Sequence, residues 1–263
     1  MARPPLSRPW RGAEPGPWQL RRLPVCASTE IELERWLRRR GGGPVAGQVP
    51  LAVVARRQRH GVGQRGRPWQ SPPGGVWLSA ALPWPPRPAV ALGLAVVVGL
   101  ALELEALGLQ PRIKWPNDLL LQGRKLAGVL PRLRLRGDRV RWAQVGVGVN
   151  GTNRVPPGAI ALGEVLAQMR GSRDRRPGCP QARPRVLEWR VLAALAWARD
   201  QAADGGGDGG PGETIRRLAE SRLQPCPDGL LHGGLRWQVE GLAADGALRL
   251  RRGTLTTRLQ RRF

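Results

Sequence analysis

The sequence is poor in several common residue types. Its 263 residues include one phenylalanine, no tyrosine and three cysteines, and only two of its 43 basic Lys and Arg residues are lysine. Glycine (36), proline (26) and tryptophan (11) are abundant instead. The hydrophobic (41%) and charged (24%) fractions are ordinary, which excludes a fully disordered or fibrous chain. The length allows one α/β domain, or a main domain with a small appendage.

Cysteines and long apolar runs are also scarce. Cys26, Cys179 and Cys226 form no C-x-x-C pair, so the sequence predicts neither a disulfide framework nor a zinc site, and it fits a reducing cytoplasm. The longest apolar run, residues 89–102, is shorter than the roughly 20 residues of a membrane span and predicts a buried helix. Residues 1–22 lack the apolar core of a secretory signal. We therefore expect a cytoplasmic protein with no membrane partner.

The formal net charge of +24 would ordinarily indicate a nucleic-acid or anionic-membrane partner. Here arginine replaces lysine almost throughout and is spread from Arg3 to Arg262, which is typical of biased codon usage rather than of a basic tract. We expect no dedicated nucleic-acid partner. A residue type that the chain avoids should stand where its chemistry is needed, and Lys114 and Lys125 lie close together.

The hydropathy pattern divides the chain into three parts. Residues 1–24 are rich in proline and arginine and are expected to form a tail. Residues 25–222 predict a mixture of strands and helices, with more strands than helices up to residue 150. Residues 223–263 predict short strands separated by D-G and G-G turns, and hence a small all-β appendage.

Within the main part, Ser28 is expected to cap a helix that ends at Gly41. Two glycine-rich or proline-rich stretches, residues 170–184 and 204–212, are expected to interrupt the fold. Further helices are expected at 185–203 and 213–221, and strands at 50–56, 76–79, 112–115, 119–121, 126–135 and 140–150.

The loop at residues 60–66 contains the pattern G-x-G-x-x-G. A dinucleotide-binding site would need a helix at the third glycine and an acidic residue about 20 positions later. Pro68 lies just after the third glycine instead, and no Asp or Glu occurs between Gly66 and Glu103, so that site is excluded. The loop is either an anion-binding backbone with Arg65 and Arg67 beside it, or a solvated basic loop.

A sharper signal is K-W-P-N-D at residues 114–118, followed by K-L-A-G at residues 125–128. Pro116 favours a turn that presents an amide and a carboxylate, and Lys125 is a point charge suited to a phosphate or carboxylate oxygen. The alternative is a hairpin turn with a surface lysine.

At these residues the sequence resembles the biotin protein ligases. The resemblance is strong from Val25 to Asn150 and weak beyond. It implies an α+β fold, with an α/β mixed-sheet catalytic domain over residues 25–222 and a small SH3-like β-barrel over residues 223–263. Because the chain begins close to its catalytic motif, we expect the monofunctional type without an N-terminal DNA-binding domain. The matching segments are Ser28-Thr29, 58–72, 74–79, 114–118, 125–128 and 146–150.

The resemblance implies a two-step reaction. Biotin and MgATP give biotinyl-5′-adenylate and pyrophosphate, and a lysine of a biotin carboxyl carrier protein of acetyl-CoA carboxylase then attacks the mixed anhydride. ATP, biotin and Mg²⁺ are the implied ligands, and a homodimer is allowed.

The resemblance also implies roles for individual residues, with the loop at residues 61–66 closing over the adenylate. The role of Asp118 stays open between orienting the carrier lysine and contacting Mg²⁺. Glu30, Val62 and Gln64 depart from the family pattern. The implied catalytic residues are Lys125, Asp118 and Arg67. The implied biotin contacts are Ser28, Thr29, Gln58, Gly61, Val62, Gly63, Gln64, Lys125 and Gly128. The implied ATP or adenylate contacts are Arg65, Arg67, Trp69, Lys114, Asn117 and Asn150.

Two other functions stay open. A lipoate or octanoate ligase would share the fold, although K-W-P-N-D with K-L-A-G favours biotin. A basic nucleic-acid-binding protein on an inactive ligase fold would show strongly salt-dependent binding and no pyrophosphate release.

Overall fold

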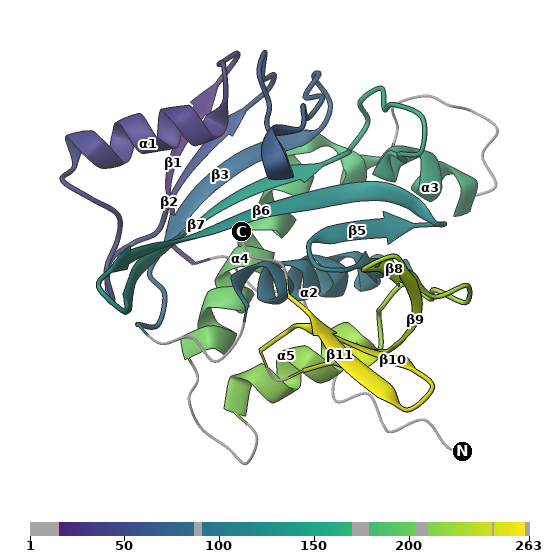
Figure 1. Cartoon of the computed structure of the whole chain (residues 1–263). Coiled ribbons are helices and arrows are strands. Elements are labelled where there is room, and N and C mark those ends of the chain that lie inside the picture. Colours follow the sequence, from purple (N-terminus) through teal and green to yellow (C-terminus); the bar gives the residue numbers. More distant parts are fainter. Residues whose placement is uncertain (1–15, 87–90, 170–178, 204–209, 244, 261–263) are drawn as a thin grey trace.

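A computed structural model describes the chain at residues 16–86, 91–169, 179–203, 210–243 and 245–260. Its main unit is a mixed seven-stranded sheet with strand order β1-β2-β3-β7-β6-β5-β4 (Figure 1). Only the β1–β2 pair is parallel among the pairs of this sheet in the described residues. The strands are β1 (Gln19–Leu23), β2 (Leu51–Ala55), β3 (Val76–Leu82), β4 (Arg112–Lys114), β5 (Asp118–Leu121), β6 (Arg124–Arg136) and β7 (Arg139–Val149).

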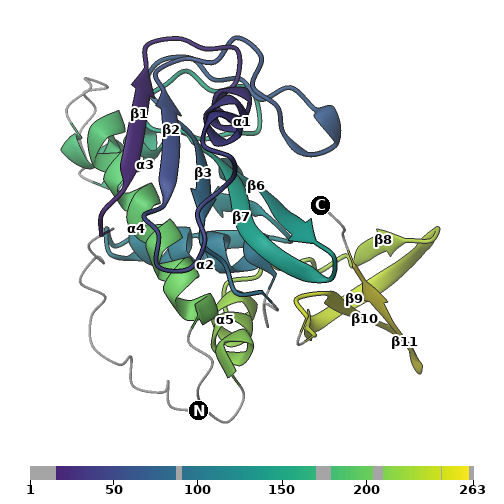
Figure 2. The same ribbon diagram turned by 90° about the vertical axis from the view of Figure 1, so that its left-hand side faces the viewer.

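Helices cover the two faces of this sheet unequally. Helix α2 (Leu92–Glu105) and helix α4 (Pro184–Ala203) pack together against one face (Figure 2). Helix α1 (Thr29–Arg39) packs on the other face, mainly over β2 and β3, and Glu30 in its first turn reaches Gln144 of β7 and Arg132 of β6. Among the described residues, no helix covers most of the face formed by β7, β6 and β5.

Side-chain alternation explains which face each strand residue occupies. In β7, Val145, Val147 and Val149 are buried in the core beneath α2 and α4, whereas the intervening Gly146 and Gly148 lie on the opposite face. A second, smaller core lies between α1 and β2, and Leu33, Trp36 and Leu37 of α1 enter it. The apolar run predicted to be a buried helix is α2, and its leucines, valines and alanines are buried along most of its length.

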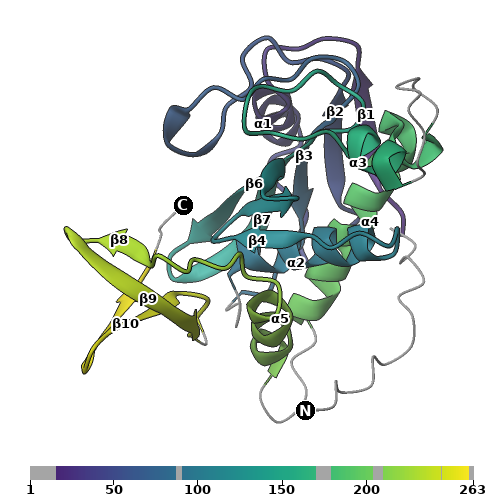
Figure 3. The same cartoon turned by 90° about the vertical axis from the view of Figure 1, so that its right-hand side faces the viewer.

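The C-terminal part forms a separate four-stranded antiparallel sheet with order β11-β10-β9-β8, which confirms the all-β prediction (Figure 3). Two contacts tie it to the edge of the large sheet. Ile113 exchanges backbone hydrogen bonds with Arg222 and Gln224, and the indole of Trp115 donates to the carbonyl of Gly246 over 2.8 Å. The strands are β8 (Leu230–His232), β9 (Leu235–Leu242), β10 (Leu248–Arg252) and β11 (Leu255–Leu259).

The structure corrects some local predictions. The predicted tail is wrong for Gln19–Leu23, because Leu20 and Leu23 are partly buried and the segment pairs with β2 as an edge strand. Helix α3 (Leu162–Met169) was not predicted, since it spans only two turns and contains Gly163. Helix α5 (Gly210–Glu220) begins inside the predicted glycine-rich break. Residues 170–178 and 204–209 of the predicted breaks lie outside the described residues.

No described helix is both long and apolar enough to span a membrane.

Candidate active site

The face formed by β7, β6 and β5 provides the floor of a large cavity of about 1140 Å³. Cavities that hold one drug-sized molecule measure about 300–1,000 Å³, so this one has room for a small acid and a nucleotide together. Its walls come from the start of α1, from the loop between β2 and β3, from β4 and β5, and from the C-terminal sheet.

Three glycines on this face of the sheet leave space above the strands, because they carry no side chain. Gly128 of β6 is paired with Gly148 of β7, and Gly146 lies two residues further along the same face. A Cβ atom on Gly148 would lie 2.6 Å from the indole of Trp69, so this indole can rest on the sheet only above glycine. The ring of Trp69 thereby forms one wall of the cavity.

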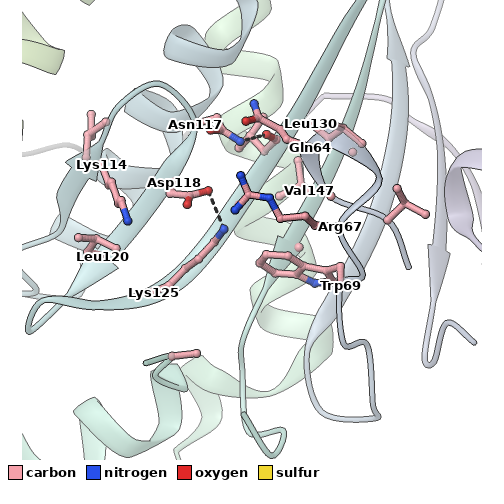
Figure 4. Close-up of a pocket in the computed structure, with 18 of the residues that line it drawn as sticks. Gln64, Arg67, Trp69, Lys114, Asn117, Asp118, Leu120, Lys125, Leu130 and Val147 are labelled. Atoms are coloured by element: carbon pink, nitrogen blue, oxygen red, sulfur yellow. Dashed lines mark hydrogen bonds and ion pairs between the residues drawn. The ribbon is translucent and has the colours of Figure 1, made fainter. Parts of the chain in front are cut away.

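One end of the cavity is basic. The Lys125 Nζ atom lies 2.8 Å from Asp118 Oδ1 and 4.9 Å from the centre of the Trp69 ring, which provides a cation–π contact. Figure 4 shows the Arg67 guanidinium in the same part of the cavity, above Trp69. Lys114 also lines the cavity, from β4. We call these residues the Lys125 end.

Next to the Lys125 end lies a set of hydrogen-bonded hydroxyl and amide groups. The Gln58 Oε1 atom accepts hydrogen bonds from the backbone N–H of Thr29 (2.8 Å) and from its hydroxyl (3.0 Å). The Gln58 amide donates to Ser71 Oγ over 2.8 Å, and the hydroxyls of Thr29 and Ser79 are 2.8 Å apart. Ser28 accepts from the backbone N–H of Glu30, which confirms the predicted N-cap of α1. The first turn of α1 is therefore fixed against the cavity.

Glu30 lies at the opposite end of the floor. Its Oε1 accepts a hydrogen bond from Gln144 Nε2 (2.9 Å) and lies 3.4 Å from the guanidinium of Arg132. Its Oε2 is 3.4 Å from the Ser79 hydroxyl. Burial is the main cause that raises the pKa of this carboxyl above its ordinary value, with a smaller opposing effect of Arg132. We call Glu30, Ser79, Arg132 and Gln144 the Glu30 end.

The loop between β2 and β3 bends over the cavity. The Gly63 N–H donates to the Arg67 carbonyl over 2.7 Å, and Arg65 between them has a left-handed backbone with φ of 57°. The side-chain Nε2 of Gln64 and the Nε1 of Trp69 are both buried and, within the described residues, without a hydrogen-bond partner. Buried polar groups are normally paired, and the Trp69 Nε1 atom faces the floor at Gly148.

Most of the residues expected to bind substrates come together in this cavity. Two exceptions are Gly61 and Arg65, which do not line it: Gly61 has no room for a Cβ beside the Trp69 carbonyl, and Arg65 is exposed. The expected residues that do line it are Ser28, Thr29, Gln58, Val62, Gly63, Gln64, Arg67, Trp69, Lys114, Asn117, Asp118, Lys125, Gly128 and Asn150.

Two asparagines of this set already serve the fold. The Asn117 amide donates to the Val129 carbonyl over 2.6 Å and is buried. Asn150 donates to the Lys125 carbonyl over 3.5 Å and accepts from Asn153 over 3.0 Å. Both hold the strands that carry Lys125 and Asp118, which is a positioning role.

Sequence reasoning assigned no role to several residues of the cavity. Ser79 and Arg132 belong to strands whose pocket-facing positions the alternation could have indicated, but no short motif marks them. Gln144 does not line the cavity; it is buried and donates to Glu30, which does. The C-terminal segment from Leu223 to Cys226 also lines the cavity and was not expected to.

No group of three His, Cys, Asp or Glu residues able to hold a metal exists in the described part of the chain. Asp118 is the acidic residue at the Lys125 end. Mg²⁺ is commonly bound through one or two carboxylates together with substrate phosphates. A single carboxylate fits a magnesium ion that arrives with a nucleotide and does not fit a resident metal centre.

Comparison with known proteins agrees with this site. Residues 46–150, which include the loop over the cavity and the Lys125 end, match the Biotin/lipoate A/B protein ligase family. The chain therefore carries a domain of this family. This chain is 38% identical over 137 residues to the bifunctional ligase/repressor BirA of Bacillus subtilis, a match that covers 49% of this chain and 42% of that protein. It is 39% identical over 117 residues to the biotin–[acetyl-CoA-carboxylase] ligase of Paracoccus denitrificans, covering 42% and 48%.

These matches span less than half the length of those two relatives. The fold extends further than the sequence match. A biotin protein ligase from Aquifex aeolicus, solved in complex with biotin and ATP, superimposes with a TM-score of 0.66 over 92% of this chain and 95% of that one, at 23% identity. The structural similarity therefore extends beyond the ligase-family domain into the C-terminal part of the chain.

Proposed function

We propose that the protein is a biotin–[biotin carboxyl carrier protein] ligase that activates biotin with ATP as biotinyl-5′-adenylate. The observation that carries the proposal is the Lys125 end, where Lys125, Arg67 and Asp118 converge above a glycine floor in the domain of the ligase family. The relatives and structural neighbours named as biotin ligases support biotin as the acid.

In the first step, a carboxylate oxygen of biotin attacks the α-phosphorus of ATP, the bond from that phosphorus to the bridging oxygen breaks, and pyrophosphate leaves. Lys125 stabilises the negative charge that develops on the phosphate and carboxylate oxygens. Arg67 binds a phosphate oxygen and Trp69 packs on the nucleotide. Lys114 contributes positive charge at the cavity wall, and Asn150 faces the nucleotide. Asp118 would hold a magnesium ion bound with ATP, and that ion would supply positive charge to offset the phosphates.

In the second step, the amine of a carrier lysine attacks the activated carbonyl, AMP leaves with the bonding electrons, and the amine loses a proton. Asp118, 2.8 Å from Lys125, is placed to orient the incoming amine in this step. The loop from Gly61 to Gly66 covers the intermediate and limits its contact with water. Val62, Gly63 and Gln64 line the cavity from this loop.

The domain arrangement proposed with this function is a catalytic domain from about residue 19 to about residue 222, and a C-terminal unit from residue 223 that corresponds to a small SH3-like barrel. Residues 1–15 of the predicted tail lie outside the described residues. The carrier of acetyl-CoA carboxylase is the proposed acceptor, and the reaction is expected in the cytoplasm.

The function is tested by offering the purified protein biotin, lipoate and octanoate separately with MgATP, and then adding a carrier domain. Biotin alone should give an acyl-adenylate, pyrophosphate and a labelled carrier. Activation of lipoate or octanoate in preference to biotin would assign the protein to the other branch of the family.

A further inference from the structure

Lys125 lies where strand β6 runs past the end of its neighbour β7. The pairing between these two strands ends with Ala127 and Val149, so residues 124–126 of β6 extend beyond β7. On the side of β5, the register shifts between Ala127 and Lys125, which marks an irregularity in the ladder. The regular pairing of the sheet therefore ends just before the lysine.

A separate segment, residues 158–160, pairs with the backbone of Lys125. The Lys125 N–H donates to the Gly158 carbonyl over 3.0 Å, and the Lys125 carbonyl accepts from the Ile160 N–H over 3.0 Å. These two bonds form a parallel bridge between Lys125 and Ala159, and both of these residues line the cavity. The segment thereby pairs both backbone groups of the lysine.

The segment is itself anchored on two sides. Ile160 is fully buried in the main core. Helix α3 follows directly, and Glu164 in its first turn forms an ion pair with Arg124, the neighbour of Lys125. Figure 1 shows α3 at the end of the sheet where β5 meets β6. Residues 158–160 therefore connect the lysine to the core on one side and to a helix on the other.

The position of the Lys125 backbone limits where its ammonium group can lie. The Nζ atom lies 2.8 Å from Asp118 Oδ1 and 4.9 Å from the centre of the Trp69 ring, between the hairpin and the loop over the cavity (Figure 4). An ammonium group stabilises a developing charge best when it is already in place, and a misplacement of about 1 Å can reduce a rate by about 100-fold. The support of this backbone therefore bears on the reaction.

We propose that residues 158–160 are positioning residues for adenylate formation, because they fix the backbone from which Lys125 extends. They act through the lysine, and this role requires no contact of their own with biotin or ATP. Gly158 is the residue best suited to a test, since its carbonyl accepts from the Lys125 N–H and its backbone is left-handed, with φ of 78°. The inference rests on the proposed function, since it assigns a support to the lysine of the same site.

The test measures biotin-dependent pyrophosphate release by Gly158→Ala and Gly158→Asn. A Cβ atom on Gly158 would meet nothing within 4 Å, so alanine strains the backbone without a collision, whereas asparagine tolerates the left-handed conformation better. Gly158→Ala should lower kcat about 10- to 100-fold, and Gly158→Asn should recover much of that loss. The KM values for biotin and ATP should stay at their wild-type values.

The matched control is Gly137→Ala, in the turn between β6 and β7. Gly137 also has a left-handed backbone, with φ of 62°, and a Cβ atom there would meet nothing within 4 Å. This variant carries the same kind of strain at the far end of β6 and should keep the wild-type kcat. Rates are expressed per site that forms adenylate in a single turnover, so a partly unfolded variant does not distort them.

A double-mutant cycle with Lys125→Ala separates positioning from other roles. If Gly158 acts through the lysine, Gly158→Ala should have no further effect on kcat once the lysine side chain is removed. An equal loss of rate in both backgrounds, a raised KM for ATP, or an unchanged kcat in Gly158→Ala would each overturn the inference alone. A wild-type protein that releases no pyrophosphate with biotin would overturn the proposed function as well.

Discussion

The Lys125 end and the Glu30 end of the cavity share the same pair of strands but are built differently. At the Lys125 end, the central ion pair comes from residues close in the sequence: Lys125 and Asp118 belong to one hairpin and lie 2.8 Å apart, and Arg67 joins them from the loop between β2 and β3. At the Glu30 end, Glu30 and Gln144 are 114 positions apart and are brought together by the packing of α1 on the sheet. The ion pair at the Lys125 end therefore depends on one hairpin, whereas the contacts at the Glu30 end depend on the tertiary fold.

Loss of the lysine should have the largest effect. Lys125→Ala should leave a folded protein, because the side chain is one-third exposed (34%), but should reduce adenylate formation by about 10²–10³-fold. The measurement is the rate of biotin-dependent pyrophosphate release under saturating substrates. Arg185→Ala is the control and should be nearly silent, since Arg185 is exposed and, in the described part of the chain, makes only a long contact with Glu188. A Lys125→Ala protein with more than about a tenth of the wild-type rate would contradict the role of the lysine.

A substitution in the glycine floor between the two ends should have the next largest effect. Gly148→Ala places a methyl group within 2.6 Å of the Trp69 indole, so the indole must shift, at a loss of about 1–3 kcal/mol in stability or in ATP binding. Urea unfolding and the KM for ATP would record it. Gly163→Ala in α3 is the matched control, because its new methyl group meets nothing closer than 3.4 Å and alanine favours a helix. If the two variants have the same stability in urea and the same KM for ATP, Trp69 does not pack on Gly148.

The loop over the Lys125 end offers a gain of function. Gln64 presents a buried amide nitrogen without a partner among the described residues, where arginine would present a charged, forked donor to the adenylate. Gln64→Arg should slow release of biotinyl-adenylate by about fivefold, or about 1 kcal/mol. The adenylate would be formed with labelled biotin and chased with unlabelled biotin and ATP. Release that is unchanged or faster would mean that another group holds the phosphate.

Substitution of Glu30 should have the smallest effect, which is a pH-dependent change in the free energy of unfolding. Burial raises the pKa of Glu30 in the folded protein, so folding favours the protonated form. The wild-type protein therefore loses stability relative to Glu30→Gln as pH rises from the ordinary carboxyl pKa through the raised one, and the difference vanishes below both. Urea unfolding of both proteins from about pH 4 to about pH 8 would measure it. A difference that is independent of pH would contradict the shift.

The contrast between the ends also explains what the sequence could predict. Short motifs and strand alternation indicated the Lys125 end, the loop over it, and most elements of the large sheet, because each depends on residues near one another in the chain. The edge strand β1 was missed because its alternation is weak and its partner β2 lies about 30 residues away. The ion pair between Arg132 and Glu30 could not be predicted for the same physical reason: only the tertiary fold brings β6 to α1.

Biotin-dependent exchange of labelled pyrophosphate into ATP tests the central claim most directly, because it reports formation of the acyl-adenylate at the Lys125 end without a carrier protein. The wild-type protein is expected to exchange label when biotin is present, and to show no exchange when biotin is omitted or replaced by octanoate. Absence of biotin-dependent exchange in a folded protein, or exchange supported by octanoate and not by biotin, would contradict it.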